Sequence, residues 1–131
     1  MDKEYAVDLV EFALKELLPR HKNIYIDVCF DEEMEDMGLC VENEYRDFTL
    51  NINPNYPLED MEKTVFHEMV HVKQYVRGEL KEKFAPKHRR YWKGEEIPEE
   101  VEYMELPWEE EAYEMEEILW NKWQFKLFYG E

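Results

Sequence analysis

TVFHEMVHVKQY, the stretch from Thr64 to Tyr75, organises the rest of this chain. Apolar residues recur through and around it at helical spacing, at Met61, Val65, Phe66, Met69, Val70, Val72, Tyr75 and Val76. Gly78 follows as a helix stop signal, and acidic residues between Glu59 and Glu62 lie where the start of a helix favours negative charge. The pattern predicts a long, buried helix.

This predicted helix contains an HEXXH motif, HEMVH, from His67 to His71. The i, i+4 spacing of the two histidines puts both imidazoles on one helix face, one turn apart, where they can bind one metal ion. Glu68 follows the first histidine and lies near the open side of such a metal, where a carboxylate can take a proton from water. The alternative is that both histidines are structural and satisfied by hydrogen bonds.

The elements around this helix predict a mixed α+β fold. Apolar residues from Asp2 to Leu18 follow a helical period that Pro19 ends, so we expect an N-terminal packing helix. Asn23 to Phe30 alternates apolar and polar residues, as a strand with one covered face does. Leu39 and Val41 indicate a second strand, and Arg46 to Asn53 predicts a third, with Phe48, Leu50 and Ile52 facing inward.

Beyond Gly78 the pattern weakens. The segment from Glu79 to Leu106 lacks a sustained period, and we expect a long irregular connection that packs on the domain through its aromatic residues. Pro107 followed by glutamates predicts the start of another helix. The aromatic tail after Trp120 is expected either to dock on the core or to cover another part of the molecule.

Length and charge restrict the class of protein. A chain of 131 residues is expected to form a single domain, residues 1–131. Its net charge of −17 repels phosphates and anionic membranes, so we expect neither nucleic acid nor a membrane as partner. No apolar run approaches the ~20 residues of a membrane span, and Met1 begins an amphipathic helix rather than a signal peptide. We therefore expect a cytoplasmic protein.

Residue usage excludes one kind of hydrolase. The chain contains no serine, so a Ser-His-Asp triad is impossible. Its two cysteines, Cys29 and Cys40, are not arranged as a CxxC pair, and reduced thiols are expected, with pairing across a hairpin as the alternative.

A catalytic zinc site needs a third protein ligand. A metzincin would have its third histidine at position 77, but that residue is Arg77. His88 is available, although its basic neighbours oppose a cation. Glu111 is the preferred candidate because it shares a helix face with Trp108 and Met115, and an inward carboxylate calls for a cation. Glu110 and Glu109 are the alternatives that remain.

HEMVH followed by PWEEEAY, from Pro107 to Tyr113, resembles the gluzincin class of zinc metallopeptidases. The short length is similar to minimal forms, the minigluzincins and related small phage or SprT-like zincin domains. The resemblance implies a zincin-like fold: an N-terminal helix, a small twisted three- or four-stranded sheet, the HEXXH helix, a long loop and a C-terminal glutamate helix. It also implies that Zn²⁺ is bound by His67, His71 and Glu111, that Glu68 is the general base and acid, and that Phe48 to Ile52 form the edge strand that pairs with a peptide substrate.

The chain departs from that pattern in places. Several gluzincins carry an acidic residue four positions after the ligand glutamate, which orients a histidine; here that position is Met115. The residue that stabilises the oxyanion is unmarked, with Tyr91, Tyr103 and Tyr113 as candidates. Minigluzincins can be held latent by their own C-terminal segment, and the aromatic tail of this chain is a candidate for such an inhibitory segment.

Together, these features predict a zinc-dependent metallopeptidase that hydrolyses peptide bonds of a peptide or protein substrate. The alternative, from a different class, is a zincin fold that binds metal or a partner without general proteolysis. A repair protease for DNA-bound proteins is a third hypothesis, which the negative charge disfavours.

Overall fold

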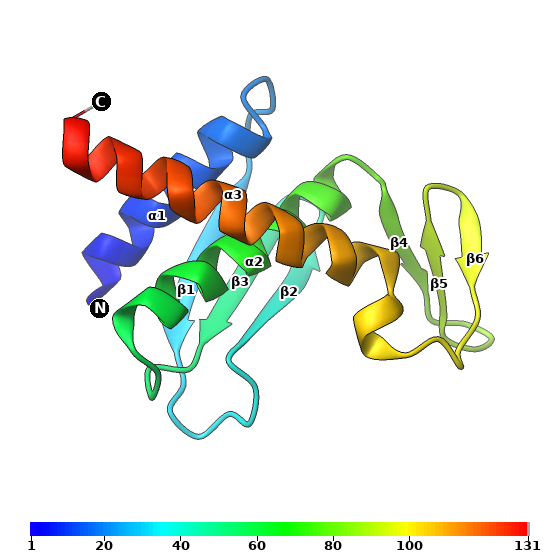
Figure 1. The fold of residues 1–131 in the computed structure, drawn as a ribbon. Helices are drawn as coiled ribbons and strands as arrows, with labels where there is room; N and C mark the ends of the chain where they lie inside the picture. The colour runs from blue at the N-terminus through cyan, green and yellow to red at the C-terminus, as the bar shows by residue number, and fades with distance from the viewer. Residues whose placement is uncertain (131) are drawn as a thin grey trace.

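The computed structural model describes residues 1–130, which form a mixed α+β fold with three α-helices and two small sheets (Figure 1). In chain order the elements are α1 (Lys3–Leu17), β1 (Tyr25–Phe30), β2 (Gly38–Glu44), β3 (Asp47–Ile52), α2 (Leu58–Val76), β4 (Leu80–Lys83), β5 (Arg89–Trp92), β6 (Glu95–Ile97), the short 3-10 helix η1 (Tyr103–Glu105) and α3 (Pro107–Tyr129). The predicted helices and the three predicted strands between the first two helices are therefore present.

The first sheet has the order β1-β3-β2, with β3 parallel to β1 and antiparallel to β2. Phe48, Leu50 and Ile52 are fully buried, which confirms their predicted inward direction. The expectation that Phe48 to Ile52 form the edge strand is wrong, because β3 is the central strand and β2 lies at the edge. Charged, exposed residues at the end of β2 suit an edge position, where they discourage pairing with another chain.

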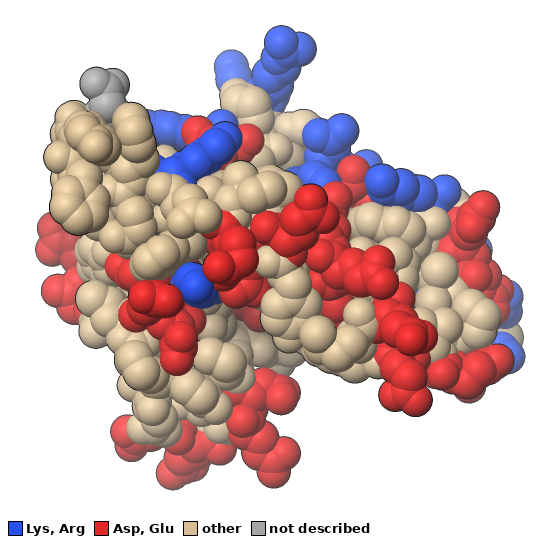
Figure 2. Space-filling view, in the orientation of Figure 1, with Lys and Arg blue, Asp and Glu red and all other residues tan. Residues whose placement is uncertain are grey.

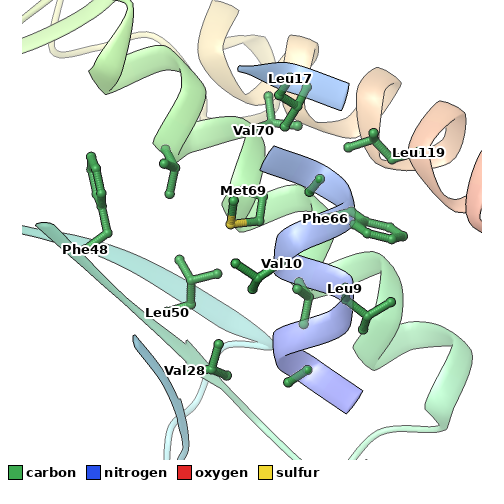
Figure 3. Close-up of a cluster of buried hydrophobic side chains, with 14 of the residues drawn as sticks. Leu9, Val10, Leu17, Val28, Phe48, Leu50, Phe66, Met69, Val70 and Leu119 are labelled. Atoms are coloured by element: carbon green, nitrogen blue, oxygen red, sulfur yellow. The ribbon is translucent and has the colours of Figure 1, made fainter. Parts of the chain in front are cut away.

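Helix α2 lies in the middle of the molecule, where it contacts α1, α3 and the strands β2 and β3, while α1 also contacts β1 (Figure 1). Asp2 caps α1 by accepting from the Tyr5 amide, and one apolar face of α1 packs on α2. Figure 3 shows Leu9 and Val10 of α1, Phe66 and Met69 of α2 and Leu50 of β3 in one cluster. The HEXXH motif is thus held on the most buried helix of the fold.

The segment from Glu79 to Leu106, which we expected to be irregular, contains the second sheet instead. Strands β4, β5 and β6 are antiparallel, in that order. Leu80 and Trp92 form a register pair and pack against Trp108 at the start of α3. These strands lack a clear alternation of apolar and polar residues because charged residues, Glu82 and Arg90, also occupy the face that carries Leu80 and Trp92.

The aromatic tail docks on the core through Trp123, whereas Phe125, Leu127, Phe128 and Tyr129 are more than half exposed. The tail continues α3 without a break to Tyr129, and the Trp123 ring packs edge-on against both Phe12 of α1 and Phe66 of α2. Its indole Nε1 donates to the Tyr5 hydroxyl at 3.0 Å. The contact closes the three-helix layer over the core.

Two further expectations can be compared with the structure. Both cysteines are free, and β3 separates the strands that carry them. Among residues 1–130, the helices include none that is long and apolar enough to cross a membrane.

Trp123→Ala should destabilise the fold by about 3–5 kcal/mol, since it removes a large buried aromatic side chain. Urea denaturation followed by far-UV circular dichroism measures this. The matched control is Phe128→Ala in the next turns of the same helix, because the Phe128 side chain is 81% exposed and should change stability by less than about 0.5 kcal/mol. Equal effects at the two positions would contradict the observed docking.

Candidate metal centre

His67 and His71 lie one turn apart on α2, and their Nε2 atoms converge on the carboxylate of Glu109 from α3. The distance from His67 Nε2 to Glu109 Oε1 is 2.8 Å, and His71 Nε2 lies 3.3 Å from Glu109 Oε2. One donor atom from each residue lies within 4.8 Å of the other two, and all three residues are buried. This geometry fits three ligands around one ion.

The structure brings Glu109, not Glu111, to the histidines. Glu111 points away and forms an ion pair with Lys73, with Nζ 3.0 Å from both carboxylate oxygens. Two residues of helix turn a side chain by about 200°, so these glutamates cannot share a face. Glu111 has no basic neighbour close in sequence, but Lys73 of α2 supplies one from a distant part of the chain.

The sequence contains a helical spacing that places Glu109 on the side of α3 that faces α2. The side of α3 that faces α2 runs through Glu109, Ala112, Glu116, Leu119 and Trp123, at alternating spacings of three and four residues. Trp108 is also buried, but it packs on the second sheet. The helix face that Trp108 and Met115 share therefore includes Glu111, whereas the face toward the histidines includes Glu109.

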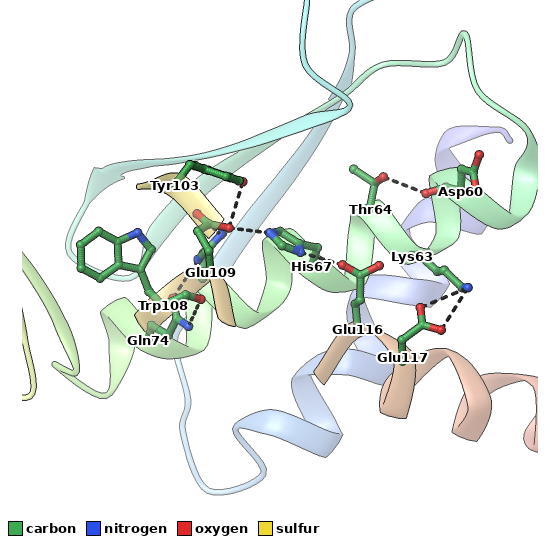
Figure 4. A network of polar contacts seen from close by, with 11 residues as sticks. Asp60, Lys63, Thr64, His67, Gln74, Tyr103, Trp108, Glu109, Glu116 and Glu117 are labelled. Carbon is green, nitrogen blue, oxygen red and sulfur yellow. Dashed lines mark hydrogen bonds and ion pairs between the residues drawn. The ribbon is translucent and has the colours of Figure 1, made fainter. Parts of the chain in front are cut away.

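Each histidine makes a hydrogen bond through its Nδ1 atom, the ring nitrogen that does not face Glu109. The Nδ1 of His67 lies 2.8 Å from Glu116 Oε1 (Figure 4), and that of His71 lies 2.8 Å from Gln74 Oε1. An ionised carboxylate and an amide oxygen only accept, so each Nδ1 carries the proton that it donates. Glu116 thus provides the orienting contact that Met115, the position expected from the resemblance, does not.

Electrostatics at the cluster reflect these contacts. Burial alone would lower the pKa of His67, but hydrogen bonds with Glu109 and Glu116 raise it to about 9. Burial opposes ionisation of Glu109 as well, yet the hydrogen bonds from His67 and His71 lower its pKa to about 2. The same carboxylate raises the pKa of His71 against the effect of burial. The ionised carboxylate attracts cations, protons and metal ions alike.

Glu68 lines a pocket of about 570 Å³ that contains the cluster. Burial is the main cause that raises the pKa of its carboxyl group. The opposite wall of the pocket includes Gly38 to Cys40 of the edge strand β2. A Cβ atom at Gly38 would collide with Thr64 Cγ2 and lie 3.2 Å from Glu68 Oε2. The glycine therefore lets β2 approach the face of α2 that carries Thr64 and Glu68.

Two of the three candidate tyrosines line this pocket, Tyr103 and Tyr113. The Tyr103 hydroxyl donates to Glu109 Oε1 at 3.0 Å, and burial is the main cause that raises its pKa. The Tyr113 ring lies with its centroid 4.5 Å from that of His67. Tyr91 lies on β5, where it contacts Lys83. Their place in the pocket therefore makes Tyr103 and Tyr113 stronger candidates than Tyr91 for the residue that stabilises an oxyanion.

The remaining candidates lie elsewhere. His88 binds Glu82 on the second sheet, at 2.7 Å, and Glu110 is exposed on the first turns of α3. Of the residues that the structure describes, those after Glu116 contribute nothing to the pocket lining. The tail lies instead along α1, where Lys122 pairs with Glu16.

No protein-family model, curated protein or solved structure matches this chain.

Gly38→Ala should destabilise the protein by about 1–3 kcal/mol, because its methyl group meets Thr64 and the neighbouring Glu68 carboxylate. Thermal or urea unfolding measures the loss. Thr64→Ser removes the methyl group in conflict and keeps the hydroxyl that donates to Asp60 O, so Gly38→Ala with Thr64→Ser should recover most of the stability. A double variant no more stable than Gly38→Ala would show that the close approach lies elsewhere.

Proposed function

We propose that this protein is a zinc-dependent metallopeptidase of the gluzincin type, with His67, His71 and Glu109 as zinc ligands and Glu68 as general base and acid. The observation that carries the proposal is the buried convergence of two imidazole Nε2 atoms and one carboxylate beside a pocket lined by Glu68. The helix, sheet, helix and glutamate-helix order is also the one that the resemblance to gluzincins implies.

The donor set fits zinc. Two neutral imidazoles and one carboxylate are the ligands of the His₂Glu catalytic class, which leaves a further position for water or substrate. Both Nδ1 atoms are engaged from behind, so both Nε2 lone pairs face the same point once their protons leave. When bound, zinc supplies a Lewis acid that polarises a scissile carbonyl.

Glu68 carries the proton transfers in this proposal. Its buried carboxylate takes a proton from the attacking water and returns it to the leaving amine, and its raised pKa suits both steps. Tyr103 and Tyr113 line the same pocket and are the candidates to donate to the oxyanion, Tyr103 by turning its hydroxyl away from Glu109.

The edge strand β2 is the proposed site of substrate pairing, in place of β3. Gly38 to Cys40 line the pocket, and an edge strand offers backbone groups to an extended peptide. The surface charge favours a peptide over a polynucleotide. Figure 2 shows Asp and Glu spread over the face where α3 runs, with Lys and Arg gathered along the edge above it.

Glu109→Ala should lose the bound zinc, because the remaining histidines give only two donors. Glu111→Ala should keep one zinc per chain, since Glu111 contacts Lys73 and Gln74 instead. Metal content after dialysis against trace zinc, measured by atomic emission, separates the two. Loss of zinc from Glu111→Ala alone would refute the assignment of Glu109.

Glu68→Ala should keep one zinc and lose cleavage of an unfolded protein such as casein by about 10²–10⁴-fold, because the proton transfers lose their carboxylate. A zinc-restored, chelator-sensitive wild-type activity is the reference. Turnover by the variant at the wild-type rate would remove Glu68 from the mechanism. Wild-type protein that binds zinc tightly but cleaves no peptide of a broad panel would instead indicate a non-proteolytic metal-binding module.

A further inference from the structure

Gln74 takes no direct part in the proposed reaction, yet its side chain is fully buried beside the metal centre. Its amide makes three hydrogen bonds. Oε1 lies 2.8 Å from His71 Nδ1, and Nε2 donates to the Trp108 carbonyl at 2.9 Å and to Glu111 Oε1 at 3.0 Å. The amide therefore connects α2 to the first turns of α3, on either side of Glu109.

The direction of this amide follows from its neighbours. The Trp108 carbonyl and the Glu111 carboxylate only accept hydrogen bonds, so the end of Gln74 that faces both must be the NH₂ group. The oxygen must then face His71, whose Nδ1 has to donate. In neutral His71 this leaves the Nε2 lone pair directed at the cluster.

Glu111 is fixed in turn by a cation. Lys73 donates to both of its carboxylate oxygens at 3.0 Å and also contacts Glu79 at 2.9 Å. The Glu111 side chain is one quarter exposed, and it neither lines the pocket nor contacts a histidine in the described structure. Its contact with the metal centre runs through Gln74.

The two histidines therefore receive different support. His67 donates directly to the carboxylate of Glu116, whereas His71 donates to a neutral amide whose orientation a second carboxylate secures. An amide can donate as well as accept, and this is what permits the added bond to the Trp108 carbonyl. One side chain thus positions both His71 and the turn that bears Glu109.

We propose that Gln74 is the positioning residue for His71 and that Glu111 acts through it by holding the amide in the orientation that leaves His71 Nε2 free to bind a divalent metal. The inference rests on the metal centre of the proposed function, but not on peptidase activity. It assigns Glu111 a role distinct from that of a ligand.

Zinc affinity of the full chain, measured by competition with a chromophoric chelator, tests the proposal. Gln74→Met, which keeps the volume of the side chain, should weaken zinc binding about 10–100-fold. Glu111→Ala should weaken it less, because the Trp108 carbonyl still orients the amide. The matched control, Glu110→Ala, alters an exposed glutamate of the same helix turn and should stay within about twofold of wild type.

Exchanging the side chains of Gln74 and Glu111 tests their hydrogen bond separately from packing, because Gln and Glu have nearly the same volume. Gln74→Glu places a carboxylate against Glu111 and removes both amide donors, so zinc affinity should fall. Adding Glu111→Gln restores a donor opposite an acceptor, and the double variant should bind zinc more tightly than Gln74→Glu alone. A double variant as weak as the single one would overturn the role of Glu111.

Nuclear magnetic resonance of the zinc-loaded protein separates positioning from general stability. Wild type should show a slowly exchanging His71 Nδ1 proton that disappears in Gln74→Met, while the fold, judged by circular dichroism, persists. Folded Gln74→Met with wild-type zinc affinity would overturn this inference alone. Failure of the wild type to bind zinc would overturn the metal centre, and the inference with it.

Discussion

Three ionisable side chains, His67, His71 and Glu109, are buried where α2 packs against α3, and the way they are partnered constrains how the two helices pack. An unpaired buried charge costs several kcal/mol, so these helices can pack closely only if donors and acceptors match across the contact. Glu109 satisfies both Nε2 atoms, while Glu116 and Gln74 satisfy the Nδ1 atoms. The hydrogen bonds that make the helix contact possible therefore also orient the candidate ligands.

The residues that line the pocket come from segments that lie far apart in the sequence. Gly38 lets the edge strand β2 approach α2, which brings strand backbone next to Glu68. Leu80 and Trp108 form part of another wall, where the second sheet meets the start of α3. The connection between α2 and α3 is thus ordered, and its packing helps to position the turn that carries Glu109.

Glu111 lies away from the histidines because a cation from another part of the chain pairs with it. An inward carboxylate does need a cation, and Glu111 has one, but the cation is Lys73 rather than a metal. Its pKa is lowered by hydrogen bonds from Gln74 and Lys73, although burial opposes this. Lys73 lies outside the sequence neighbourhood that was considered, since long-range pairing cannot be seen from local spacing. The edge position of Phe48 to Ile52 was implied by the resemblance alone, and the alternation of buried residues could not correct it, because central strands and covered edge strands share that pattern.

Local patterns in the sequence determined the mixed α+β class, the long buried helix and the placement of His67, Glu68 and His71 on it, because helical periodicity and the HEXXH spacing are properties of neighbouring residues. The tertiary structure alone decided which glutamate meets the histidines, which strand borders the pocket and where the aromatic tail lies. Each residue turns a helix by about 100°, so the choice between Glu109 and Glu111 depends on the rotation of α3 about its own axis. That rotation is set by Trp108 against the second sheet and by Leu119 and Trp123 against the core, contacts between segments far apart in the chain.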